Sequence, residues 1–352
     1  MSVKTEGSSN YEYVTARVRS RRAKLFDADD YRKLVRMGPS AIARFMEDTE
    51  YEVEMNALGT RHSGVDLIEY ALNRNLAKHF DDLLTWADGS LYEYIANYLR
   101  KFDAWNIKTV IRGIYTGADT QEIEDDLIRT GEFSRRTLDR LVESTSIEDA
   151  IGVLSGTIFG EPLEAAYEDF ESLDVLVPLE NAVDRAFFSH LLDDIGHPEP
   201  DTATALYREF LEAEIDFRNL RNALRIARSG AEIDPAEYFI EGGRLFDGEE
   251  LRQLAPNTDE LVTQIRESSY GRDLSDALDE LESATSLIGF EHALNTALLE
   301  YSEKLSNRYP LSICPVLSYI LAKEREIENI RAIARGREAG LSVEEIEEEL
   351  VQ

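Results

Sequence analysis

Asp103-Ala-Trp-Asn106-Ile-Lys108-Thr-Val-Ile-Arg112 is a ten-residue stretch that recurs twice further along the chain. It returns as Asp216-Phe-Arg-Asn219-Leu-Arg221-Asn-Ala-Leu-Arg225 and again as Glu326-Ile-Glu-Asn329-Ile-Arg331-Ala-Ile-Ala-Arg335. The shared form is acid-x-x-Asn-apolar-base-x-apolar-apolar-Arg, and the three asparagines are separated by 113 and then 110 residues. A pattern of this length at one period indicates an architecture built from copies of one structural unit.

A second repeated element has the same period. It centres on a glutamate, in Ile68-Glu69-Tyr-Ala-Leu-Asn73, Leu179-Glu180-Asn-Ala-Val-Asp184 and Phe290-Glu291-His-Ala-Leu-Asn295. The three glutamates are 111 residues apart in both steps, and each precedes its asparagine by a similar distance, 37, 39 and 38 residues. A third, weaker repeat is a hydroxyl-x-aromatic pattern, found in Thr49-x-Tyr51, Thr157-x-Phe159 and Ser268-x-Tyr270.

These repeats predict the domain organisation. We expect three similar domains that span residues 11–130, 131–243 and 244–352, after a flexible N-terminus formed by residues 1–10. The stretch Tyr11–Val35 resembles the helices around the asparagine motif and predicts a partial extra copy that begins the first domain.

The chain reads as helix nearly throughout, so we predict an all-α fold. Apolar residues recur at spacings of three and four, and the alternating β-branched runs of an all-β protein are missing. Helix starts are predicted at Ser146, at Asp234-Pro235 and at Ser342, because these residue types cap helix N-termini. Glycines such as Gly117 and Gly340 fall where the asparagine helices should end and turn.

The repeated positions divide into two faces of one helix. Because each residue advances 100° on an ideal helix, the apolar positions one, four and five residues after the asparagine form one stripe. The asparagine lies at its border, and the two basic positions lie together on the other side. We predict that Asn106, Asn219 and Asn329 hydrogen-bond across a helix–helix joint within each domain. The basic pairs fit two interpretations, ion pairs with nearby carboxylates or docking to the next domain or a partner; these pairs are Lys108/Arg112, Arg221/Arg225 and Arg331/Arg335.

Composition narrows the class of protein. A formal net charge of −32 with only eight lysines is the surface expected of a protein adapted to concentrated salt. Such a surface is a poor partner for nucleic acid and for anionic lipid. No apolar run reaches the roughly 18 residues needed to span a bilayer, and the N-terminus has no signal-peptide character. The single cysteine, Cys314, excludes an intrachain disulfide and fits a reducing compartment.

A search for catalytic or metal-binding motifs finds little. The chain has no phosphate loop, no dinucleotide-binding glycine motif and no zinc-binding pattern, so we expect no cofactor and no catalytic residues. The nearest approach to a metal site is Asp193-Asp194-Ile-Gly-His197, which precedes two prolines and is more typical of a solvated loop. A metal-dependent helical enzyme using these three residues is the alternative that it leaves open.

These sequence features carry a family resemblance. The opening Tyr11-Glu-Tyr-Val-Thr-Ala-Arg17-Val-Arg19-Ser-Arg21-Arg22, the threefold motif and the length resemble the C subunit of the archaeal A-type ATP synthases, which is related to the d subunit of eukaryotic vacuolar ATPases. The resemblance implies a funnel-shaped, all-helical protein of three similar domains around a pseudo-threefold axis. It further implies a non-catalytic, peripheral subunit on the cytoplasmic face of the membrane. The implied partners are the proteolipid rotor ring and the central shaft subunits, between which the chain transmits rotation.

Without the family resemblance, the repeat alone does not predict a rotary role. Three helical copies without a recognisable active site predict only a scaffold. A general helical-repeat scaffold for protein partners is therefore the alternative to a rotary adapter.

Overall fold

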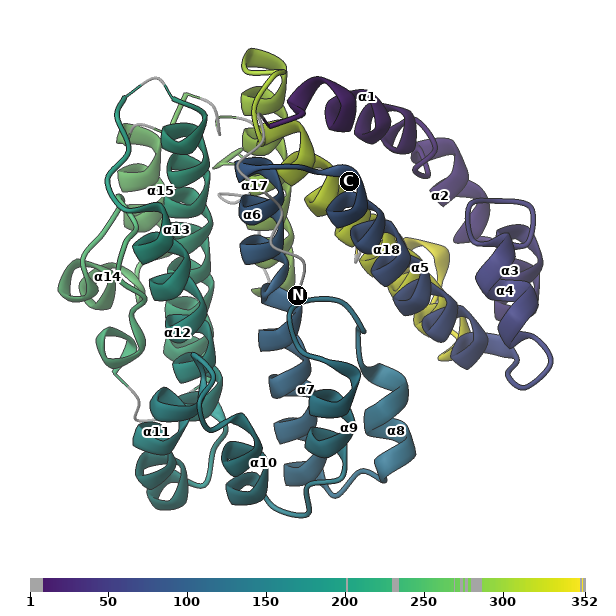
Figure 1. The fold of residues 1–352 in the computed structure, drawn as a ribbon, viewed down its shortest axis with the longest axis horizontal. Coiled ribbons are helices and arrows are strands. Elements are labelled where there is room, and N and C mark those ends of the chain that lie inside the picture. The colour runs from purple at the N-terminus through teal and green to yellow at the C-terminus, as the bar shows by residue number, and fades with distance from the viewer. Residues whose placement is uncertain are drawn as a thin grey trace. The chain divides into compact units, whose positions relative to one another are not determined.

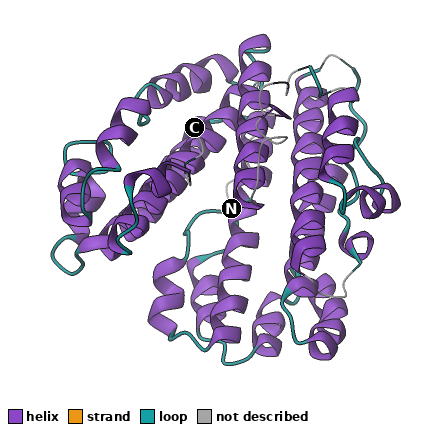
Figure 2. Cartoon of the chain, turned by 180° about the vertical axis from the view of Figure 1, so that it is seen from behind, coloured by secondary structure: helices purple, strands orange, loops and turns teal. Residues whose placement is uncertain are grey.

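The computed structural model of the chain describes residues 9–200, 202–229, 234–268, 270–272, 275, 278–279, 287–348 and 350. All regular secondary structure in this part of the chain is helical, as Figure 2 shows from behind, and the all-α prediction is confirmed. None of the helices described is both long enough and apolar enough to cross a membrane. The predicted flexible stretch 1–10 lies, except for its last two residues, outside the described residues.

The chain forms two compact units, which share helix α5 (Gly64–Trp86). The first unit holds residues 73–198 with the short stretches 1–10 and 240–242. Around its helix α7 (Lys101–Thr116) pack four short helices, α6, α8, α9 and α10, and the long helix α12 (Val177–Ile195). The remaining helices of this unit, all labelled in Figure 1, are α6 (Ser90–Leu99), α8 (Thr120–Asp126), α9 (Arg135–Val142), α10 (Ile147–Leu154) and α11 (Gly160–Leu173).

The second unit holds residues 11–72, 199–239 and 243–352. Its long helices α13, α17 and α18 pack in that order, and the N-terminal helices lie on α18. Its helices are α1 (Tyr11–Arg22), α2 (Ala28–Leu34), α3 (Pro39–Met46), α4 (Glu52–Leu58), α13 (Ala203–Ser229), the 3₁₀ helix η1 (Pro235–Tyr238), α14 (Gly248–Leu254), α15 (Thr258–Glu267), α17 (Leu287–Arg308), α18 (Cys314–Glu338) and α19 (Val343–Glu348).

The core follows the predicted stripe. In α7 the apolar positions of the motif, Ile107, Val110 and Ile111, are fully buried, whereas Arg112 is exposed on the other side. The corresponding apolar residues of α13 and α18 are buried as well. Burial of about three apolar side chains per motif stabilises each helix by several kcal/mol relative to exposure.

Helix ends match the predicted capping residues. Ser146 begins α10 by accepting the backbone N–H of Asp149, and Asp234 caps η1 in the same way. Ser342 and Glu345 bond each other's backbone N–H groups at the start of α19. Gly117 ends α7 with a φ of 74°, a left-handed conformation that glycine adopts without steric cost.

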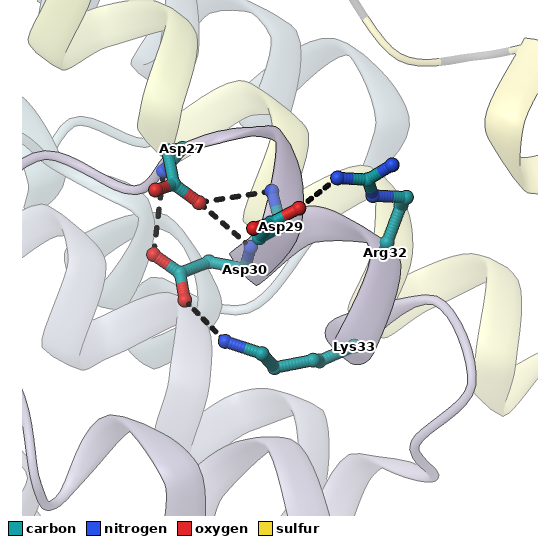
Figure 3. Close-up of polar contacts among 5 residues, drawn as sticks. All are labelled: Asp27, Asp29, Asp30, Arg32 and Lys33. Carbon is teal, nitrogen blue, oxygen red and sulfur yellow. Dashed lines mark hydrogen bonds and ion pairs between the residues drawn. The ribbon is translucent and has the colours of Figure 1, made fainter.

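Acidic residues cap the first short helix of two copies. Asp27 accepts the N–H groups of Asp29 and Asp30, and Asp30 accepts that of Asp27, so both side chains close the start of α2 (Figure 3). Arg32 and Lys33, one turn later, form ion pairs with these carboxylates. Asp247 caps α14 by the same reciprocal arrangement. The Asp27–Asp30 turn is thus a helix start whose acidic residues are bonded within it.

The hydroxyl-x-aromatic pattern forms the same local hydrogen-bonded structure in all three copies. The hydroxyl of Thr49 donates to the carbonyl of Met46 at 2.7 Å and accepts the N–H of Tyr51 at 3.3 Å. Thr157 bonds Leu154 and Phe159 in this way, and Ser268 bonds Ile265 and Tyr270. A short side-chain hydroxyl can bond both neighbours only in a tight turn, so the three copies share a backbone geometry here.

The helices that pack together do not all belong to the same sequence copy. Helices α9 and α10, which follow residue 131, pack on α7 of the preceding copy, and α14 packs on α13. The N-terminal helices α2 and α3 pack on α18, the asparagine helix of the last copy. Each asparagine helix is therefore covered by short helices from the next copy in cyclic order. The predicted domain boundaries themselves stay a prediction.

Candidate functional site

The repeated asparagine is a buried joint between a helix and a loop. Asn106 is completely buried in α7, and its amide nitrogen donates to the carbonyl of Ile128 at 2.7 Å. The backbone N–H of Ile128 donates to the amide oxygen of Asn106 at 2.9 Å. One amide side chain thus satisfies both backbone groups of one residue, which removes the desolvation cost of burying all of them.

The other two asparagines are also buried. Asn219 and Asn329 are each 2 % exposed, and both have polar partners. Asn329 hydrogen-bonds the side chain of Tyr31, which lies on α2. The asparagines therefore hold buried polar contacts, and the partner of Asn106 is a loop rather than the second helix of the prediction.

The acid that begins each motif has a role that the sequence did not reveal. Asp103 accepts the backbone N–H groups of Glu132 and Phe133 at 2.7 and 3.1 Å. Asp216 accepts those of Arg244 and Leu245, and Glu326 accepts that of Phe26 at 2.6 Å. In all three cases the bonded loop leads directly into the next capped short helix. The signal that could have shown this role is the acid itself, which is present at one spacing in all three motifs.

Glycine lets the loop approach the acid in two of these joints. A Cβ atom on Gly131 would lie 2.5 Å from Oδ1 of Asp103, and one on Gly243 would come still closer to Oδ1 of Asp216. Both approaches are far below van der Waals contact, so a larger residue would push the loop away from the carboxylate.

Burial raises the pKa of two of these acids, Asp103 and Asp216. It raises the pKa of Asp103 from 3.8 to about 7, although the N–H groups of Glu132 and Phe133 counteract the shift. It raises the pKa of Asp216 from 3.8 to about 6 against two similar bonds. At Asp103 and Asp216, protonation is therefore linked to folding.

The last base of each motif pairs with the repeated glutamate. The Nε–H of Arg112 donates to Glu180 at 2.5 Å. Arg225 forms a two-bond ion pair with Glu291, and Arg335 forms one with Glu69. The two repeated sequence elements thus bind each other, and in each pair the arginine and the glutamate come from different copies. The arginine side chains are about half exposed, at 49, 56 and 60 %.

The earlier base of the motif lies deeper. Lys108 Nζ forms an ion pair with Asp184 at 2.7 Å, and both side chains are nearly buried. Arg221 donates to Asn295, at the position that corresponds to Asp184, and burial lowers its pKa to about 10. Arg331 also has a polar or electrostatic partner. The role of the six basic residues as contacts between the domains or to a partner stays a prediction.

The candidate metal cluster is not assembled. Among the described residues, no group of three His, Cys, Asp or Glu side chains is arranged to hold a metal ion. Asp194 is the end of a local network instead, because it lies 3.5 Å from His190 and accepts from Asn97 at 2.9 Å. These contacts give the metal-dependent enzyme no support.

The comparisons with known proteins agree on one family. The family model for the ATP synthase (C/AC39) subunit matches residues 14–349. The chain is 66 % identical to the C subunit of the A-type ATP synthase from Haloferax volcanii, over 99 % of both chains. It is 63 % identical to the protein of that name from Halorubrum lacusprofundi, over 98 % of both, and 37 % identical to that from Methanococcoides burtonii, over 99 % of this chain and 97 % of the relative. The first two of these relatives, and that from Halobacterium salinarum at 58 % identity over 98 % of both chains, come from halophilic archaea, in agreement with the acidic, lysine-poor composition.

Proposed function

The chain belongs to the ATP synthase (C/AC39) subunit family, and from this premise we propose that it links the central shaft of an A-type ATP synthase to the membrane rotor ring. It is a non-catalytic subunit of that complex. In the proposed role it binds the shaft subunits on one side and the proteolipid ring on the other, and rotates with both. It would lie at the cytoplasmic face of the membrane and reach the bilayer only through its protein partners.

The observation that carries the proposal is the cyclic order of the arginine–glutamate pairs. Arg112 of the first copy binds Glu180 of the second, Arg225 of the second binds Glu291 of the third, and Arg335 of the third binds Glu69 of the first. This order supports three similar domains, over residues 11–130, 131–243 and 244–352, around a pseudo-threefold axis. We propose the basic pairs as the contacts between these domains.

Transmission of torque requires helices that keep their places under load. The buried asparagine and carboxylate joints supply directional bonds between helices and loops, and such bonds fix orientation where apolar contacts alone do not. The contact with the ring must depend on shape and desolvated groups, because salt near 1 M screens charges beyond about 3 Å.

Membrane vesicles from cells that lack the chain provide the test. ATP hydrolysis by the detached catalytic head should persist, whereas ATP synthesis driven by an ion gradient should be abolished. Addition of the purified chain should restore synthesis, and a variant such as Asn106→Ala should restore less. Gradient-driven synthesis that is unchanged without the chain would overturn the proposal.

A further inference from the structure

The N-terminal segment, residues 11–58 with helices α1 to α4, follows helix α18 along its length (Figure 1). Its polar contacts advance in the same order on both partners. Arg22 donates to Ser318 at 2.7 Å, Tyr31 hydrogen-bonds Asn329, and the carbonyl of Met37 accepts from Arg337 at 3.3 Å. The segment therefore contacts α18 from near the start of that helix to near its end.

The middle of this contact is a fully buried ionic cluster. Glu326 on α18 binds Lys323 Nζ at 2.7 Å and the hydroxyl of Tyr51 at 2.6 Å through Oε1, while its Oε2 accepts the N–H of Phe26. Lys323 also donates to the hydroxyl of Tyr51 at 2.8 Å and lies over its ring. These side chains are at most 3 % exposed, so each charge depends on the others for solvation.

The corresponding joints in the other two copies are built differently. The position of Lys323, three residues before the acid, is occupied by Arg100 in the first copy and by Ala213 in the second. Arg100 pairs with the exposed Glu132 at 2.7 Å, and in neither joint, among the described residues, does a cation bond the buried acid. The position of Tyr51 is held by Phe159 and Tyr270.

Chain connectivity explains why this joint differs. Asp103 and Asp216 bind loops that lie 28 to 30 residues further along the same chain, so a loop that opens stays close to its acid. Glu326 binds Phe26, which is 300 residues away and precedes it in the chain. No short stretch of chain therefore keeps Phe26 near Glu326 when this contact opens.

We propose that Lys323, Glu326 and Tyr51 form a buried clasp that holds the N-terminal segment on α18, and that this segment opens as one unit when the clasp is broken. In the other two joints a short stretch of chain keeps the loop near its acid. Here the clasp takes that role. Its burial also suits concentrated salt, because salt screens the half-exposed arginine–glutamate pairs but leaves a desolvated cluster nearly unchanged. The N-terminal segment is then the part of this unit that detaches first, while α13, α17 and α18 stay folded.

Hydrogen–deuterium exchange of the full chain in molar KCl tests the clasp. Lys323→Met keeps the length of the side chain and leaves Glu326 without its cation. It should accelerate exchange in α1 to α4 together, and in α2 and α3 by about tenfold or more. Exchange in α7 and in α13 should not change. Tyr51→Phe removes only the hydroxyl and should accelerate the same helices by a smaller factor, which secures the test if Lys323→Met fails to fold.

Lys108→Met is the matched control. It removes a lysine from the first asparagine helix, where the ion pair with Asp184 is within the other compact unit. It should leave the exchange of α2 and α3 as it is in the natural chain. The proposal is wrong if Lys323→Met and Tyr51→Phe leave the exchange rates of α2 and α3 unchanged. It is also wrong if they accelerate exchange equally in α2, α3, α7 and α13.

Discussion

Asn106 and Ile128 bind each other at both ends of one amide, with the side-chain nitrogen 2.7 Å from the carbonyl oxygen and the side-chain oxygen 2.9 Å from the backbone nitrogen. Ile128 lies in the loop after α8, and both residues are buried. Because water cannot replace the side chain there, removal of the amide leaves two backbone groups without partners.

Asn106→Ala should therefore lower the free energy of unfolding by about 2–4 kcal/mol. Asn106→Asp should cost at least as much, because a carboxylate oxygen would face the carbonyl of Ile128. Chemical denaturation in a constant salt concentration measures both. Asn222→Ala, three residues after Asn219 at a partly exposed position of α13, is the control and should change stability by less than about 0.5 kcal/mol. An effect of Asn106→Ala as small as that of the control would show that the joint contributes nothing.

Stability should depend on pH through Asp103. Its pKa is raised from 3.8 to about 7, so between these values the folded state binds a proton that the unfolded chain releases. The contribution of this residue to the free energy of unfolding must then fall as the pH rises from about 4 to about 7. For Asp216 the same loss should occur between about 4 and about 6.

The Asp103→Asn variant isolates this contribution from the other acids. The difference in unfolding free energy between the natural chain and the variant should shift in favour of the variant as the pH rises through the window. Denaturation at a series of pH values measures it. A difference that is constant from pH 4 to pH 8 would contradict the raised pKa.

The two kinds of ion pair should respond differently to salt. Arg225 and Glu291 are partly exposed, so a double-mutant cycle should give a coupling of about 0.5–1 kcal/mol in dilute salt that approaches zero in molar KCl. Lys108 and Asp184 are nearly buried, so their coupling should be about 1–3 kcal/mol and should persist. Equal salt dependence of the two couplings would show that burial does not distinguish them.

Local features of this chain were predictable from its sequence, whereas the partners of its polar side chains were not. Helix starts at Ser146 and Ser342 follow from capping chemistry, which involves residues three apart. The apolar stripe of α7 follows from helical periodicity. Both depend on short stretches of chain, and both were confirmed.

The joints depend on contacts that no spacing encodes. The partners of Asp103 are backbone N–H groups, which every residue except proline carries and which leave no mark in the sequence. Glu180 was found as a repeated residue, but only the packing of α7 on α12 brings it to Arg112. Tyr51 and Lys323 are 272 residues apart and belong to no common motif. Repetition identified which residues matter, and the three-dimensional arrangement was needed to show what each binds.

Gly113 should tolerate no side chain, although it lies in the interior of α7. A Cβ atom there would overlap Cγ1 of Ile123 on α8, and one on Gly336 of α18 would be 2.8 Å from Cγ1 of Ile346 on α19. Alanine is the better helix former, so propensity alone would stabilise each variant by roughly 1 kcal/mol. The clash forces the following short helix to move, and overpacking of this kind costs about 1–3 kcal/mol.

Gly113→Ala should thus be net destabilising, whereas Gly152→Ala on α10, where nothing lies within 4 Å, should stabilise by about 0.5–1 kcal/mol. Thermal unfolding of the two variants measures the opposite signs, and stabilisation by both would show that α8 moves aside without cost.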